Sequence, residues 1–146
     1  MTTRAGDLGA AVREIEHTAD LGLEVEAPTL PLLFERAGIA TLALMLDLTA
    51  IEPRTRATLA LAADDVEELL HDWLQTLVVR AQTDGLAFTE LTVEAVDERS
   101  VQAHGAGEHV DPRRHRSYTE IKGVTYHQLA VRETPDGWWA RIIFDV

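Results

Sequence analysis

The chain has 146 residues, and 46% of them are hydrophobic, which is enough to bury a core and argues against disorder. It contains no cysteine, so disulfides, cysteine-ligated zinc and thiol nucleophiles are excluded. Its 25 acidic residues outnumber the 13 basic ones and give a formal net charge of −12. This charge predicts that the chain does not bind nucleic acid by itself, and it favours a basic protein partner or a bound cation.

The sequence predicts one domain over residues 1–146, in which residues 1–11, rich in glycine and alanine, form a loose lead-in. No apolar stretch near the N-terminus resembles a signal peptide, and none reaches the roughly 20 residues that a membrane span needs. We therefore expect a cytoplasmic protein without membrane contacts. No oligomeric state is predicted.

The first part of the chain is expected to form two short strands and a helix. The polar sequence His17-Thr18-Ala19-Asp20 interrupts two strand-like runs, and the second run, 21–27, alternates apolar and polar residues as a half-buried strand does. Thr29 is expected to cap a helix that extends to about Leu46. From Ile39 to Leu48 nearly every residue is apolar, so this helix is expected to be buried on more than one side.

A second helix is expected to begin at Asp64-Asp65, with Glu67 at the position that a capping box requires. An apolar stripe follows along residues 66–81, and Gly85 suits a left-handed cap after the end of the helix. His71 and Asp72 lie between the apolar positions of this stripe. We therefore expect both to lie on the solvated face of the helix.

Strands and turns dominate the rest of the chain. A polar loop is expected at 108–116, a hairpin turn at Pro135-Asp136-Gly137, and strands at 54–61, 88–96, 99–107, 117–132 and 138–146. Two helices and about seven strands predict an α+β fold. We expect a two-layer sandwich in which two long helices pack on one mixed, mostly antiparallel sheet.

Carboxylates near the two ends of the chain form the main candidate site. Asp20 lies between two predicted strands, and Asp145 follows the apolar residues of the last strand. Val146 would add the oxygens of a terminal carboxylate. Taken singly, these acids are ordinary turn and end residues. If the fold brings Asp20 beside Asp145 and Val146, their hard oxygen donors would suit Ca²⁺ or Mg²⁺.

A second candidate is the pair Glu120 and Lys122, which share one face of an extended segment. The ordinary interpretation is a surface ion pair. If that face looks onto the metal carboxylates, Lys122 would contact a phosphate or a carboxylate instead. The chain has no GxxxxGK[ST], GxGxxG, HExxH or GxSxG motif, so a self-sufficient nucleotide-hydrolysing or zinc enzyme is not expected.

Several motifs, in one order, resemble the archease family along nearly the whole chain. They are EIEHTADLGLEV at 14–25, DDVEELLHDWLQTLV at 64–78, GLAF at 85–88, DPRRH at 111–115, EIKGVTYH at 120–127 and GWWARIIFDV at 137–146. The resemblance implies a small α+β accessory protein of the tRNA-splicing RNA ligase, not an enzyme. Such a protein promotes guanylylation of the ligase histidine and repeated turnover in joining 2′,3′-cyclic-phosphate or 3′-phosphate ends of RNA to 5′-hydroxyl ends.

The resemblance also implies a divalent cation, calcium in the family, held through Asp20, Asp145 and Val146. Further positions that it implicates in activating the ligase are His17, Arg114, Glu120, Lys122 and His127, and Arg114 stands where a lysine is common. An alternative role implied by the family is a chaperone-like binding module that modulates tRNA-modifying enzymes. The presence of both the HTAD sequence and the terminal FDV favours the ligase cofactor, because a scaffold needs neither.

Overall fold

The computed structural model describes residues 1–17 and 20–146, and for Glu16 and His17 it describes the main chain alone. The described residues form two α-helices, α1 (Leu30–Met45) and α2 (Val66–Gln82), and two short 3₁₀ turns, η1 (Gly9–Ala11) and η2 (Leu48–Ala50). They also form nine strands: β1 (Thr2–Arg4), β2 (Val12–His17), β3 (Asp20–Ala27), β4 (Thr55–Ala62), β5 (Leu86–Val96), β6 (Ser100–His109), β7 (Gly123–Val124), β8 (Ala130–Thr134) and β9 (Gly137–Asp145).

The strands of the described chain divide into two sheets. One has the order β1-β5-β6-β4, and the other has the order β2-β3-β9-β7, with β8 also paired to β9. Every pairing between these strands is antiparallel. The predicted α+β class is confirmed, but the strands form two antiparallel sheets where the sequence predicts one mixed sheet of about seven strands. Strand alternation shows which face of a strand is buried and does not show which sheet the strand joins.

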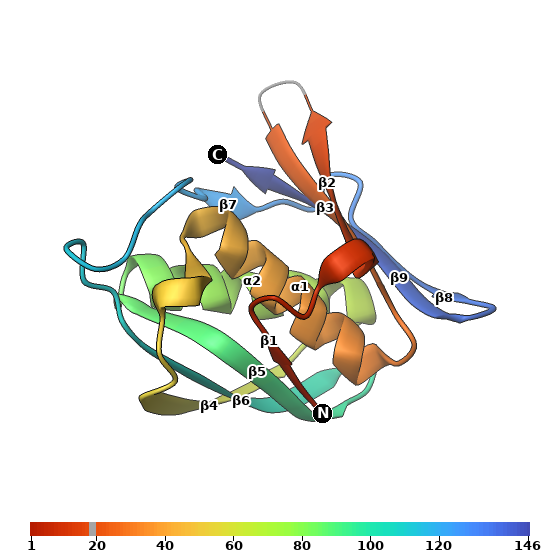
Figure 1. Cartoon of the computed structure of the whole chain (residues 1–146). Coiled ribbons are helices and arrows are strands. Elements are labelled where there is room, and N and C mark those ends of the chain that lie inside the picture. The colour runs from red at the N-terminus through yellow and green to blue at the C-terminus, as the bar shows by residue number, and fades with distance from the viewer. Residues whose placement is uncertain (18–19) are drawn as a thin grey trace.

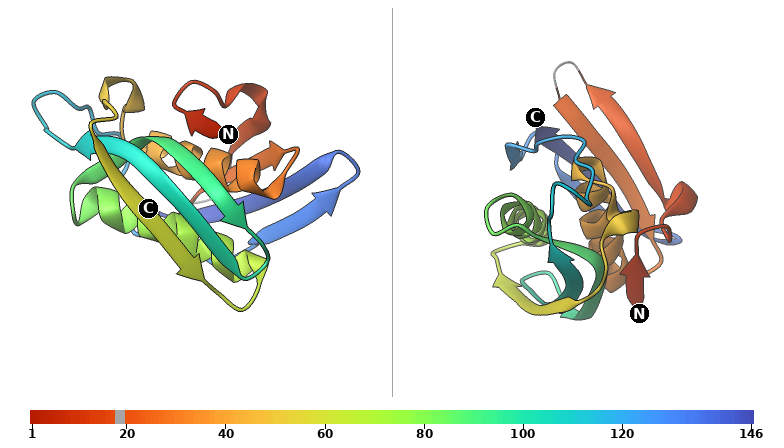
Figure 2. Two further views of the ribbon diagram at one scale, coloured as in Figure 1. Left: turned by 90° about the horizontal axis from the view of Figure 1, so that it is seen from below. Right: turned by 60° about the vertical axis from the view of Figure 1, so that its left-hand side comes forward.

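Helix α1 lies between the two sheets, where it contacts β5 on one side and β3 on the other (Figures 1 and 2). This position agrees with the prediction that the helix is buried on more than one side. Gly38 lets α1 approach β5 and α2 closely, since a Cβ there would lie 2.5 Å from Leu91 Cδ1 of β5 and 2.9 Å from Leu77 Cδ1 of α2. The predicted cap is confirmed as well, because the Thr29 hydroxyl accepts a hydrogen bond from the main-chain N–H of Leu32.

Helix α2 begins one position away from the predicted capping pattern. Asp65 is the N-cap, and its carboxylate accepts a hydrogen bond from the Glu68 N–H at 2.8 Å. The capping partner is therefore Glu68, three residues after the cap, and not Glu67. Gly85 has a φ of +71°, the left-handed conformation that the sequence predicts after this helix. No helix of the described residues is long and apolar enough to cross a bilayer.

Residues 1–11 are not the loose lead-in that the sequence predicts. They contain β1, which pairs with β5, and the buried Thr3 hydroxyl donates to Glu35 Oε1 at 2.8 Å. The second carboxylate oxygen of Glu35 accepts from the Val93 N–H at 2.8 Å. One carboxylate in the core thus connects β1, α1 and β5. Burial raises the pKa of Glu35 above its ordinary value of 4.5, and the hydrogen bonds from Val93 and Thr3 oppose this shift.

The raised pKa of Glu35 predicts a pH dependence of stability. Since the folded pKa lies above the unfolded value, the favourable contribution of the protonated group is full below about pH 4.5 and is lost as the pH rises through the folded pKa. Glu35→Gln removes this dependence, because an amide can accept from Val93 and donate to Thr3 without carrying charge. We expect this variant to be at least as stable as the wild type at pH 7 in urea unfolding.

Glu35→Ala is the matched comparison, since it leaves the buried Val93 N–H without its acceptor, at a cost of about 1–3 kcal/mol. Equal losses of unfolding free energy for the glutamine and alanine variants at pH 7 would contradict this account of the core carboxylate.

Candidate functional site

The pairing of β3 with β9 brings the two candidate metal carboxylates together. Asp20 of β3 is directly opposite Asp145 of β9. Directly opposite residues of an antiparallel pair project from the same face, with Cβ atoms about 5 Å apart. Two negative charges at such a separation repel, and a divalent cation between them would neutralise the repulsion.

The register that makes this pair is fixed from the other face of the sheet. The side chains of β3 and β9 that alternate with the aspartates are buried in the core, among them Leu23, Ile142 and Phe144. On the face that carries the aspartates, Gly22 is opposite Ile143, and a Cβ at Gly22 would lie 2.8 Å from Ile143 Cδ1. A slip of one residue would expose the core side chains and drive Ile143 against a larger neighbour.

A third strand, β7, lies beside the Asp20–Asp145 pair, and we refer to this end of the sheet as the corner. Gly123 of β7 pairs with Asp145, and the Lys122 N–H donates to the Asp145 main-chain oxygen at 2.7 Å. The structure therefore places the main chain of Lys122 beside Asp145, with the lysine side chain at an exposed position. Val146 follows Asp145 directly and is half-buried.

The predicted strand at 117–132 is wrong for most of its length. Within it, residues 123–124 form β7, and β8 begins at residue 130. The period-two argument that places Glu120 and Lys122 on one face therefore does not apply, because both precede β7. Glu120 is exposed and lines a hollow of about 360 Å³ between the ends of the two helices and the loop at 117–120.

The histidines of the predicted site have different surroundings. His17 is opposite Asp20 at the end of the β2–β3 pair, its side chain is not described, and Thr18 and Ala19 lie outside the described residues. His127 is exposed, and its main-chain N–H donates to the Thr125 hydroxyl at 3.2 Å. The register thus brings the His17 main chain to the aspartate pair.

Arg114 belongs to a different cluster. Its guanidinium lies 3.1 Å from Glu108 Oε1, and the same oxygen contacts the buried His115 ring at 2.9 Å and the Glu52 N–H at 3.1 Å. Glu108, predicted in a polar loop, ends up buried in β6. The hydrogen bond from Glu52 and the contacts with His115 and Arg114 lower the pKa of Glu108. These contacts hold the loop at 111–116 against β6 and the segment that follows η2.

Sequence reasoning missed His71, which it places on a solvated face. The side chain of His71 is 14% exposed, its Nε2 lies 2.8 Å from the Val124 carbonyl oxygen and its Nδ1 lies 2.9 Å from Asp72 Oδ1. Its ring stacks on Tyr126 with 4.0 Å between the ring centroids. No local sequence signal reports this contact, because it depends on how residues 121–126 pack against α2.

The donor set of the corner fits a hard cation. Within the described part of the chain, no three His, Cys, Asp or Glu side chains gather as a ligand cluster, so the pair Asp20 and Asp145 would supply the side-chain ligands. Ca²⁺ takes six to eight oxygens, and main-chain oxygens and water commonly complete its shell. Carboxylates without nitrogen or sulfur partners suit calcium or magnesium better than zinc.

The fold and this corner define a small α+β protein with a candidate all-oxygen cation site where β3 begins and β9 ends. The sequence model of the Archease protein family matches residues 13–146, and the chain belongs to the archease family. It is 37% identical to the archease of Methanopyrus kandleri over 136 residues, covering 91% of this chain and 97% of the relative. It is 34% identical to the archease of Methanosarcina acetivorans over 142 residues, covering 94% and 97%.

Two solved structures share the fold. The solution structure of protein 1598 from Methanobacterium thermoautotrophicum superposes with a TM-score of 0.76 at 24% identity, covering 93% of this chain and 99% of that one. The crystal structure of a Thermotoga maritima archease, described as a possible chaperone, gives a TM-score of 0.63 at 22% identity, covering 92% and 96%. These likenesses show that the chain shares its overall fold with both proteins.

The Glu108 cluster generates a prediction about acid stability. Because the folded pKa of Glu108 is lowered, its contribution to stability is present above about pH 4.5 and is lost as the pH falls through the folded value. Glu108→Gln is expected to lower the melting temperature by a few degrees at pH 7, with the difference from the wild type shrinking below pH 4. The exposed Glu98→Gln is the control and should melt like the wild type. A constant difference at every pH would contradict the assignment.

Proposed function

We propose that this archease is the protein cofactor of the tRNA-splicing RNA ligase. In this role it promotes guanylylation of the ligase histidine and lets the ligase turn over repeatedly while it joins 2′,3′-cyclic-phosphate or 3′-phosphate ends to 5′-hydroxyl ends. Membership of the family supports the role. The observation that carries it is the Asp20–Asp145 pair, because the β3–β9 register brings together the two motif carboxylates that the role requires.

The proposed cofactor in this role is a divalent cation, calcium or magnesium, held by Asp20, Asp145 and the main-chain oxygens of Val146. When bound, the cation supplies a positive charge that phosphate oxygens can approach. The chain itself holds the two carboxylates at one separation through the strand register. It also anchors Lys122 by its main chain on Asp145, so that the lysine ammonium stays near the same corner.

The remaining candidate residues have supporting roles in this proposal. Glu120 and His127 flank the Lys122 segment at exposed positions and are suited to contact the ligase. His17, opposite Asp20, lies at the aspartate end of the sheet. Arg114 acts through Glu108 to hold its loop, because the structure engages its guanidinium there.

The net charge of −12 defines the kind of surface that this chain fits. An acidic protein is repelled by RNA phosphates, so the archease binds the ligase and not RNA alone. We expect the cleft of an RNA ligase that holds phosphates and metal ions to have the complementary positive potential. The proposed place of action is the cytoplasm.

Removing either carboxylate tests the proposal directly. Asp20→Asn and Asp145→Asn are expected to weaken calcium binding by at least about tenfold and to abolish multiple turnover in ligation assays with limiting ligase. Single-turnover joining by ligase that is already guanylylated should continue. The readouts are calorimetric titration with calcium and the rate of RNA joining.

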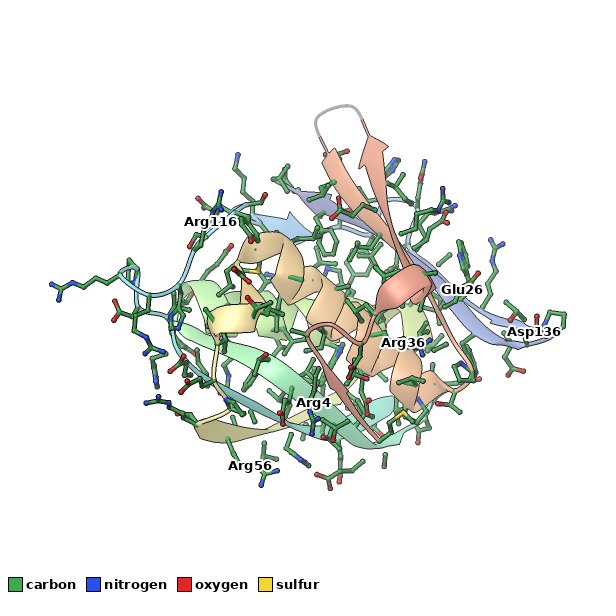
Figure 3. The ribbon with its side chains drawn as sticks, in the orientation of Figure 1. Arg4, Glu26, Arg36, Arg56, Arg116 and Asp136 are labelled. Atoms are coloured by element: carbon green, nitrogen blue, oxygen red, sulfur yellow. The ribbon has the colours of Figure 1, made fainter. Side chains whose placement is uncertain are left out.

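Asp136→Asn is the matched control, since it makes the same charge change in the exposed turn at the far end of β9, where Figure 3 labels Asp136. This variant should bind calcium and activate the ligase like the wild type. Unchanged multiple turnover by the Asp20 and Asp145 variants would contradict the proposal and would favour the chaperone-like role.

Charge complementarity predicts that activation depends on salt. The archease concentration that gives half-maximal activation should rise several-fold as monovalent salt increases from about 50 to 300 mM, because screening weakens the attraction between acidic and basic surfaces. Guanylylated ligase assayed alone over the same salt range corrects for effects on the ligase. A half-maximal concentration that does not change with salt would remove electrostatic steering from the account.

A further inference from the structure

Side chains of α2 form hydrogen bonds with the main chain of the segment that carries Lys122. Gln82 bonds to both main-chain groups of Ile121, accepting from its N–H at 2.9 Å and donating to its carbonyl at 2.8 Å. Gln75 Oε1 accepts from the Val124 N–H at 2.9 Å, and His71 Nε2 donates to the Val124 carbonyl at 2.8 Å. We refer to His71, Gln75 and Gln82 as the α2 clamp.

The clamp residues occupy one face of the helix. Their spacing of four and then seven residues follows the helical repeat, beside the stripe that buries Trp73 and Leu77 in the core. A carbonyl oxygen only accepts hydrogen bonds, so His71 Nε2 carries the proton in its bond to Val124. The Tyr126 ring, stacked on the imidazole at an interplanar angle of 13°, adds a contact at the end of the segment.

The opposite edge of the same segment is bonded to β9. The Lys122 N–H donates to the Asp145 oxygen at 2.7 Å, and the Thr125 N–H donates to the Ile143 oxygen at 3.0 Å. Residues 121–125 therefore lie between β9 and α2, and the helix side chains take the place of a neighbouring strand. A strand of two residues is too short to hold its position through its own ladder.

We propose that the α2 clamp is a set of positioning residues for ligase activation. It fixes Lys122 and Gly123 against Asp145, so that the lysine and the carboxylate pair keep one geometry when the ligase docks. The clamp acts through this segment and touches neither the RNA nor the cation. The inference rests on the proposed function, because the role of the fixed geometry is to serve the ligase.

The test is the double variant Gln75→Met with Gln82→Met. Methionine keeps the side-chain length and the helix propensity but removes three of the four hydrogen bonds of the clamp. We expect faster amide hydrogen exchange at Lys122 and Val124, with exchange in α1 and β5 unchanged. Maximal ligase activation at saturating archease should fall by about tenfold, as is typical when the supports of a functional group are removed.

Two further variants separate positioning from general destabilisation. Gln75→Glu retains an acceptor for the Val124 N–H and should retain activation, whereas Gln75→Met alone should lose part of it. Gln102→Met, the same change at an exposed position of β6 in the other sheet, should leave exchange and activation unchanged. Should the double variant fail to fold, the single Gln75 variants carry the test.

Full maximal activation by a folded clamp variant whose exchange is raised would overturn the inference, and so would unchanged exchange at Lys122 and Val124. Asp20→Asn in the same assay separates this outcome from failure of the proposed function. If Asp20→Asn loses activation while the clamp variant keeps it, the clamp inference alone fails. If both keep it, the carboxylate site itself is not used.

Discussion

The register between β3 and β9 is the constraint on which the rest of the structure depends. One face of this strand pair supplies Leu23, Ile142 and Phe144 to the core, and the burial of these side chains fixes how the strands align. The same alignment sets Asp20 opposite Asp145 on the other face. Apolar burial has no chemical specificity of its own, yet here it positions the two carboxylates. The hydrophobic core thus holds two like charges together at the ends of β3 and β9.

The corner around Asp20 and Asp145 is also supported by α2. Residues 121–125 bond to β9 on one side and to α2 on the other, so the sheet, the helix and the segment between them all contribute to the corner. Helix α2 is itself fixed by its buried stripe and by the indole of Trp73, which donates to the Phe34 carbonyl of α1 at 2.9 Å. The position of Lys122 therefore depends on the packing of α1 between the sheets. In this way the core fixes the segments that carry the exposed residues of the corner.

Much of this architecture could be predicted from local patterns. The cap at Thr29, the buried stripe of α2, the β5–β6 hairpin and the turn before β9 follow from capping, periodicity and turn chemistry.

The carboxylate pair could be proposed from residue type, and the family resemblance suggested which acids to join. The division into two sheets and the environment of His71 could not be predicted, because both depend on contacts between segments far apart in the chain. The strand predicted at 117–132 is largely absent because main-chain groups there bond to side chains of α2, as Ile121 does to Gln82, and not to a neighbouring strand.

The most direct measurement of the central claim is a calcium titration of the wild-type protein followed by amide chemical shifts. We expect saturable shifts concentrated at Asp20, Gly123 and Asp145, with one binding event where β3 begins and β9 ends. Shifts that grow without saturation and spread over the acidic surface would show diffuse counterion attraction, and would contradict a cation site formed by the register of these two strands.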